Sequence, residues 1–150
     1  MASLRETLKL GWREWVALPE LGLGPVKAKV DTGARTSAIH AFALRTFEED
    51  GIEFVEFKVH PIQKNNEHVA VCRAKVFDRR VVTDSGGHKE ERIVIETMLE
   101  IGEHRWPIEA TLTARDTMLF RMLLGRTALR RRAVVDPAQS YLVGKAVKET

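Results

Sequence analysis

The sequence predicts a mainly β protein whose strands form a closed or nearly closed barrel. Several short runs alternate apolar and polar residues with a period of two, whereas a helical pattern is scarce. Turns rich in glycine, proline or aspartate separate these runs. The 150 residues, 44% of them hydrophobic, suffice for one core but not comfortably for two, so we expect 1–150 to be a single domain.

The first predicted elements are a hairpin and two further strands. Trp12–Leu18 and Leu23–Val30 are expected to pair, because a proline- and glycine-containing turn separates them and the second run alternates valine and alanine with lysine. Ile52–Val59 and Val69–Val76 are rich in β-branched residues, which favours strands.

Two more hairpins are predicted in the middle of the chain. Arg79–Thr83 and Glu90–Ile95 flank Asp84–His88, a turn-forming pentapeptide that we interpret as an exposed hairpin tip. Arg92–Ile101 and His104–Thr113 both alternate cleanly and are joined by a Gly-Glu turn, so they are expected to pair with each other.

Towards the C-terminus the sequence predicts one short helix and a last apolar segment. The helix is expected over Arg126–Arg132, directly after Gly125. A turn at Asp136-Pro137 then precedes the apolar segment Tyr141–Val143, which we interpret as a terminal strand.

Composition argues against several classes of protein. No apolar run is long enough to cross a bilayer, and the first residues lack the apolar core of a secretory signal. The single cysteine, Cys72, cannot form an internal disulfide and fits a reducing compartment, so we expect a cytoplasmic protein with no membrane association. The net charge of +3, from 24 basic and 21 acidic residues, is too small to indicate a nucleic-acid binder.

Common catalytic signatures are missing from the sequence. It contains no His-Glu-x-x-His or paired Cys-x-x-Cys zinc motif, no phosphate-binding loop and no Gly-x-Ser-x-Gly elbow. The five histidines are scattered, so we predict neither a metal site nor a cofactor. A zinc hydrolase whose histidines are gathered by folding is the alternative.

Two short motifs remain as candidates for a site. Asp31-Thr32-Gly33 follows an apolar strand, and the glycine permits a tight bend beside the carboxylate. The second motif, 122–126, is Met-Leu-Leu-Gly-Arg, an apolar run that ends in Gly-Arg before the predicted helix.

In this order, and with a β-rich stretch between them, the two motifs resemble those of the retroviral-type (retropepsin) aspartic proteases. The resemblance implies a retropepsin-like acid-protease barrel in which Asp31 is catalytic and the hairpin around 84–88 is a flap. It also assigns support of the catalytic loop to six residues: Thr32, Gly33, Ala34, Leu124, Gly125 and Arg126.

A longer match points to one bacterial branch. Four segments resemble the RimB-type family: Gly11–Val16, Lys27–Ala41, Trp106–Leu112 and Thr113–Asp116. Members of this family are often labelled as ATP-dependent zinc proteases, although this sequence has neither the zinc motif nor the nucleotide loop. The resemblance implies a functional partner, a RimK-type ATP-grasp ligase that adds glutamates to a ribosomal protein. The implied activity is a peptidase that trims such tails.

Stoichiometry adds a condition to this interpretation. Aspartic proteolysis needs two carboxylates that share a proton, and the chain contains one Asp-Thr-Gly. The resemblance therefore implies a homodimer in which Asp31 meets its counterpart across a two-fold axis. Trp12–Leu18 and Tyr141–Val143 are candidate interface segments, unless their apolar residues pack in the core.

Arg35 stands where the viral proteases carry an acid, so Arg126 needs another partner, for which Asp116 is the candidate. A cation beside the loop favours acidic peptides as substrates, because arginine binds carboxylates in a bidentate manner. A structural ion pair is the alternative role for Arg35. The residues expected to bind substrate are Arg35, Arg79, Arg80, Ser85, Gly86 and Gly87.

Two other functions stay open. The chain could be a retropepsin-like endopeptidase with an unrelated cytosolic substrate. It could also be a non-catalytic module that binds acidic tails or ribosomal RNA.

Overall fold

Strands account for most of the residues that the computed structural model describes, which are 7–61, 67–83, 86–114 and 120–144. The main sheet contains β2 (Arg13–Leu18), β3 (Leu23–Val30), β4 (Ser37–His40), β8 (Asp78–Thr83), β9 (Lys89–Ile101), β10 (His104–Thr113) and β11 (Met122–Leu124). An outer sheet contains β5 (Phe42–Glu49), β6 (Ile52–Val59) and β7 (Ala70–Lys75). The remaining elements are β1 (Leu8–Leu10), the 3-10 helix η2 (Pro19–Leu21), the helix α1 (Arg126–Leu129) and β12 (Ala133–Val135).

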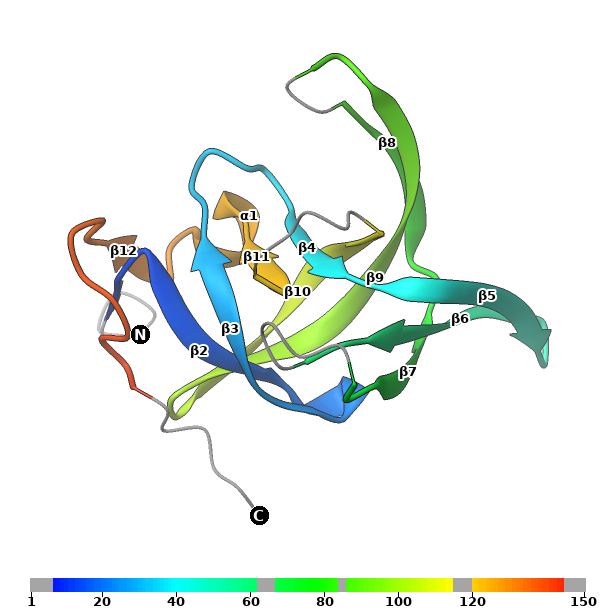
Figure 1. Ribbon diagram of the computed structural model, residues 1–150, viewed down its shortest axis with the longest axis horizontal. Helices are drawn as coiled ribbons and strands as arrows, with labels where there is room; N and C mark the ends of the chain where they lie inside the picture. The colour runs from blue at the N-terminus through cyan, green and yellow to red at the C-terminus, as the bar shows by residue number, and fades with distance from the viewer. Residues whose placement is uncertain (1–6, 62–66, 84–85, 115–119, 145–150) are drawn as a thin grey trace.

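The main sheet closes on itself. Its strand order is β10-β4-β11-β3-β2-β9-β8, and β10 pairs with β9 as well as with β4. All of these strands except β8 therefore form a closed barrel, while β8 and the first part of β9 project from it as a hairpin (Figure 1). The prediction of a mainly β, closed barrel with a projecting hairpin and one short helix is confirmed.

Strand register brings the two sequence motifs together. β3 and β11 run parallel, with Val30 opposite Leu124, so both strands end at the same edge of the barrel. β11 also pairs antiparallel with β4, where Met122 lies opposite Ile39. Because the chain continues from these strand ends into Asp-Thr-Gly and Gly-Arg, the two motifs meet.

The buried core includes residues of the barrel strands and of the outer-sheet strands β6 and β7. Alternate residues of the strands point inward, as the period of two predicts. In β3 these are Val26, Ala28 and Val30, and the lysines between them point away. Ile95 and Leu99 of β9 are fully buried against the same core.

The predicted hairpins match the structure closely. The first predicted hairpin corresponds to β2 and β3, and the pair expected over Arg92–Ile101 and His104–Thr113 corresponds to β9 and β10. β9 begins earlier, at Lys89, and its first residues pair with β8. Gly86 and Gly87 are exposed in this projecting hairpin. Ser85, also expected there, lies outside the described residues.

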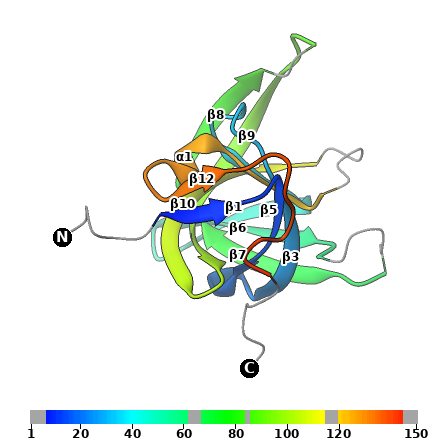
Figure 2. The same cartoon turned by 90° about the vertical axis from the view of Figure 1, so that its left-hand side faces the viewer.

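Several strands were not predicted. β6 matches the predicted strand Ile52–Val59, but its partner β5 is mostly exposed, so the sequence of β5 lacks the apolar alternation that reveals a strand. β1 and β12 pair in parallel, as Figure 2 shows, although they lie at opposite ends of the chain. Three-residue strands are too short to establish a period.

Two predictions at the C-terminal end were wrong. The helix ends at Leu129 rather than at Arg132, and Arg131 adopts a positive φ of 66°, which is not helical. Tyr141–Val143 is not a strand, because the backbone amides of Leu142 and Val143 donate to the carboxylate of Glu14 instead.

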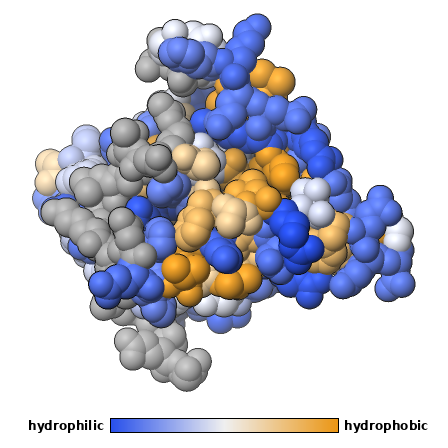
Figure 3. Space-filling view, turned by 45° about the vertical axis from the view of Figure 1, so that its right-hand side comes forward, coloured by the Kyte–Doolittle hydropathy of each residue, from blue (hydrophilic) through white to orange (hydrophobic). Residues whose placement is uncertain are grey.

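No helix in the described part of the chain is both long and apolar enough to cross a membrane. Figure 3 shows that apolar side chains gather in the middle of one face and that hydrophilic residues surround them.

Candidate active site

The Asp31 loop, residues 31–36, connects β3 to β4 and is fixed by its own backbone. The amide of Gly33 donates to Oδ1 of Asp31 at 3.0 Å, and the amide of Ala34 donates to the Asp31 carbonyl at 3.2 Å. The amide of Asp31 in turn donates to the carbonyl of Leu124 at 2.8 Å, which ties the loop to β11. The half-buried carboxylate is thus held at the edge of the barrel in one orientation.

The Gly-Arg motif holds the loop from the other side. The amide of Arg126 donates to the carbonyl of Ala34 at 2.8 Å, and the amide of Thr127 donates to the carbonyl of Arg35 at 3.1 Å. These amides belong to the first turn of α1, whose N–H groups have no partner within the helix. The loop carbonyls therefore cap the helix while the helix supports the loop.

The side chain of Arg126 joins this arrangement. Its Nη1 donates to the carbonyl of Gly33 at 3.2 Å. Asp116, the expected partner of Arg126, lies outside the described residues. The guanidinium therefore supports the Asp-Thr-Gly turn directly, through a backbone oxygen.

Ser37 is a supporting residue that sequence reasoning missed. It is fully buried at the start of β4, and its Oγ accepts a hydrogen bond from the amide of Gly125 at 3.1 Å. A Cβ atom on Gly125 would lie 2.6 Å from the backbone carbon of Thr36, so glycine is needed for this close approach. Ser37 stands only six positions after Asp31, but a hydroxyl gives no sign in sequence of being buried under a loop.

A groove of about 1180 Å³ opens in front of the Asp31 loop. β8 of the projecting hairpin and side chains of β9 and β10 form its other walls. The charged side chains that line it are of both signs: Asp31, Arg35, Arg80, Arg92, Glu96 and Glu109. Of these, Arg92, Glu96 and Glu109 were not among the predicted site residues. The groove brings Arg35 and Arg80 to the same space as Asp31.

Two of the groove arginines already have acidic partners. Arg80 pairs with Asp78 and with Glu109, each at 2.9 Å, and these two hydrogen bonds raise the pKa of its guanidinium. Arg92 pairs with Glu90 at 2.7 Å. Arg35 differs, because it is exposed and forms no ion pair with any residue that the structure describes.

Arg79 does not line the groove. Its guanidinium forms a two-pronged pair with Glu53 of β6, at 2.9 and 2.6 Å, and this hydrogen bonding lowers the pKa of Glu53. Gly86 and Gly87 of the hairpin are likewise absent from the described lining of the groove. The structure therefore groups only part of the predicted substrate-binding set.

Two further observations concern metal-ligating side chains and the single thiol. The described part of the chain contains no group of three or more His, Cys, Asp or Glu side chains placed to hold a metal ion. The thiol of Cys72 is buried, and burial raises its pKa to about 11, so the thiol is protonated near neutral pH.

A closed barrel with an Asp-Thr-Gly loop at its edge, held by a Gly-Arg segment, places the chain among the retropepsin-like proteins. The chain belongs to the RimB-like family: the family model described as retropepsin-like aspartic endopeptidase RimB matches residues 9–146. A crystal structure of a Legionella pneumophila protein of unknown function (DUF785) has the same fold. It superposes with a TM-score of 0.77 at 24% identity and covers 92% of this chain and 99% of that one.

Longer proteins contain a sequence similar to this chain. A probable alpha-L-glutamate ligase of Shewanella halifaxensis is 46% identical over 136 residues, and one of Desulfotalea psychrophila is 45% identical over 141 residues. These alignments cover 91% and 94% of this chain but only 30% of each relative. The chain thus spans less than a third of the proteins that carry the ligase name.

Proposed function

We propose that the chain is an aspartic peptidase that acts as a homodimer, with Asp31 of each protomer at the centre. The observation that carries the proposal is the carboxylate of Asp31, which is held by the amide of Gly33 and lines an open groove. In the dimer one ionised Asp31 accepts a proton from the attacking water, and the protonated partner donates to the scissile carbonyl. The RimB-like family description supports this chemistry.

The Asp31 loop is also the surface that we assign to the two-fold contact. Thr32 and Gly33 are exposed in the single chain, so a second loop can approach them. β2, the earlier candidate, pairs with β3 and β9, and its apolar residues Val16 and Leu18 are buried in the core. The loop therefore suits the interface better than β2 does.

We further propose that the substrates are acidic peptides, above all oligo-glutamate tails. Arg35 shares the groove with Asp31 and retains an unpaired guanidinium among the described residues, whereas Arg80 is neutralised by Asp78 and Glu109. A free guanidinium binds a carboxylate in a bidentate manner. The relatives that contain a similar segment are named as probable alpha-L-glutamate ligases, and this name supports glutamate as the ligand. A RimK-type ligase would supply the substrate, a glutamylated ribosomal protein.

Cleavage of a peptide with a C-terminal oligo-glutamate tail tests the reaction. Mass spectrometry should show products that differ by whole glutamates, and Asp31→Asn should abolish them. Asp50→Asn is the matched control, because Asp50 lies in the β5–β6 turn with a positive φ of 53°, which asparagine tolerates. If the unaltered protein and Asp31→Asn both bind the peptide in a salt-sensitive manner and neither cleaves it, the protein is a binding module instead.

Mixing protomers tests the dimer. If each site needs both copies of Asp31, an equal amount of Asp31→Asn protein added to the active protein should lower its activity to about half, by random exchange of protomers. A ninefold excess should lower it to about one tenth. Activity that does not change on mixing, although the protomers demonstrably exchange, would contradict a shared site.

A further inference from the structure

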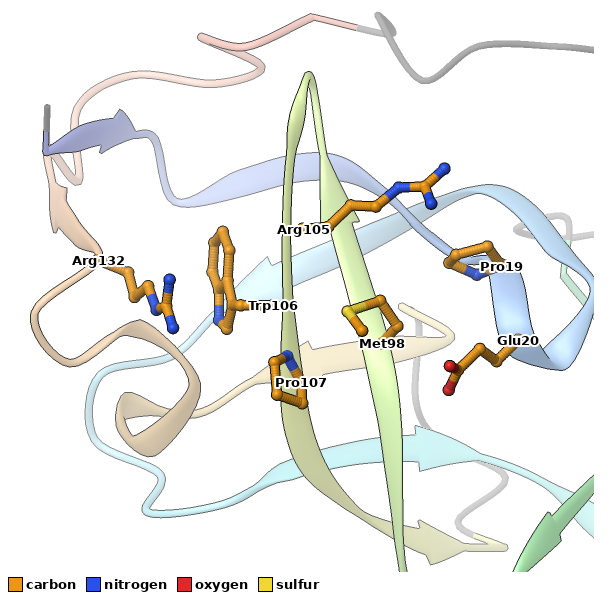
Figure 4. A pocket seen from close by; sticks show the side chains of 7 residues that line it. All are labelled: Pro19, Glu20, Met98, Arg105, Trp106, Pro107 and Arg132. Carbon is orange, nitrogen blue, oxygen red and sulfur yellow. The ribbon is translucent and has the colours of Figure 1, made fainter. Parts of the chain in front are cut away.

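A second pocket lies further along β9 and β10, toward the turn that joins them. Its volume is about 410 Å³, and Figure 4 shows the side chains that line it. Met98 and Pro107 lie opposite each other on the two strands and form an apolar platform, with Pro19 of η2 beside it. The volume is at the lower end of the range for small-molecule sites.

The two ends of this pocket carry opposite charges. Arg132 lies at one end, its Cζ 5.1 Å from the centre of the Trp106 ring, and Glu20 lies at the other (Figure 4). Neither forms an ion pair with a residue that the structure describes. Arg105, which also lines the pocket, is by contrast paired with Glu100 at 3.1 Å. An unpaired cation and an unpaired anion thus face one apolar platform.

The cationic end is held in place before any ligand arrives. Trp106 is buried, and its indole Nε1 donates to the carbonyl of Ala128 in α1 at 2.8 Å. The amide of Arg132 donates to the carbonyl of Leu129 at 2.9 Å, which fixes the backbone below the guanidinium. A half-buried guanidinium stacked on a fixed indole loses little freedom on binding a carboxylate.

We propose that this pocket binds a short peptide with free termini and an apolar side chain. Its C-terminal carboxylate lies against Arg132, its side chain covers Met98 and Pro107, and its ammonium group faces Glu20. Because the two ends of the pocket carry opposite charges, a ligand with both a carboxylate and an ammonium group should bind more tightly than a ligand with only one of them. The site is separate from Asp31 and does not depend on the reaction proposed there.

Leucyl-leucine is the probe for this site. The chain contains three tryptophans, so three indole N–H signals are expected in a ¹⁵N spectrum. Titration should shift the Trp106 signal saturably, while Trp12 and Trp15, which do not line the pocket, serve as internal controls. If the Trp106 signal shows no saturable shift up to about 10 mM dipeptide, the proposal is overturned, because a dissociation constant above that concentration means very weak binding.

Blocked dipeptides test the two charges one at a time. We expect leucyl-leucine amide and N-acetyl-leucyl-leucine each to bind about 3- to 10-fold more weakly than the free dipeptide. Arg132→Gln should remove the preference over the amide, and Glu20→Gln should remove the preference over the acetylated form. Glu20 is exposed, so its variant tests the proposal even if the loss of Arg132 disturbs folding. Equal binding of all three dipeptides would refute the assignment.

Discussion

Ser37→Ala tests how the Asp31 loop is held. The substitution removes the Oγ that accepts the hydrogen bond from the amide of Gly125, in a position that water does not reach. A buried donor left without its partner costs about 1–3 kcal/mol. For a domain of this size that loss lowers the melting temperature by roughly 2–4 °C per kcal/mol.

Ser37→Ala should also reduce the catalytic activity. Gly125 precedes Arg126, whose amide and guanidinium hold the carbonyls of Ala34 and Gly33. A shift of Gly125 therefore loosens the turn that orients Asp31, and we expect kcat to fall by about tenfold, with a smaller change in KM.

Urea denaturation and cleavage of the oligo-glutamate peptide measure the two effects. Ser140→Ala is the matched control, because the Oγ of Ser140 accepts a hydrogen bond from the half-buried guanidinium of Arg13, at 3.2 Å, rather than from a backbone amide near Asp31. Its free energy of unfolding should change by less than about 0.5 kcal/mol. If Ser37→Ala unfolds and cleaves like Ser140→Ala, the hydrogen bond to Gly125 does not support the loop.

Three further predictions concern single side chains. Gly125→Ala places a Cβ 2.6 Å from a backbone carbon of the Asp31 loop, so it should destabilise the protein by more than about 2 kcal/mol in urea denaturation and abolish cleavage. Gly24→Ala is the control, because open space surrounds that position, and its free energy of unfolding should change by less than about 1 kcal/mol. The hydrogen bond from Arg79 lowers the pKa of Glu53, so the stability that this pair adds is complete above the ordinary pKa of 4.5 and is lost as the pH falls through the lowered pKa. Glu53→Gln should therefore reduce the melting temperature at pH 7 and leave it unchanged at a pH well below the lowered pKa. An equal reduction of the melting temperature at the two pH values would contradict the pairing. The buried thiol of Cys72, with a pKa of about 11, should react with a disulfide reagent at pH 8 only on unfolding in urea, and rapid reaction of the folded protein would show that it is accessible.

The outer sheet and the ion pairs show which features need the folded structure. β5 carries mostly exposed polar residues, so no apolar period marks it as a strand, and its place depends on pairing with β6. Glu53, which pairs with Arg79, and Glu109, one of the two acceptors of Arg80, come from distant positions, and no local rule selects them.

The sequence by itself determined the barrel class, its main hairpins and the Asp-Thr-Gly loop. Alternation and turn residues are local, so a single pass along the chain detects them. Tertiary structure alone decided that Ser37 lies beneath Gly125 and that Arg35, unlike Arg80, forms no ion pair within the described part of the chain. Such contacts join residues that are far apart along the chain, and their geometry exists only once the barrel closes.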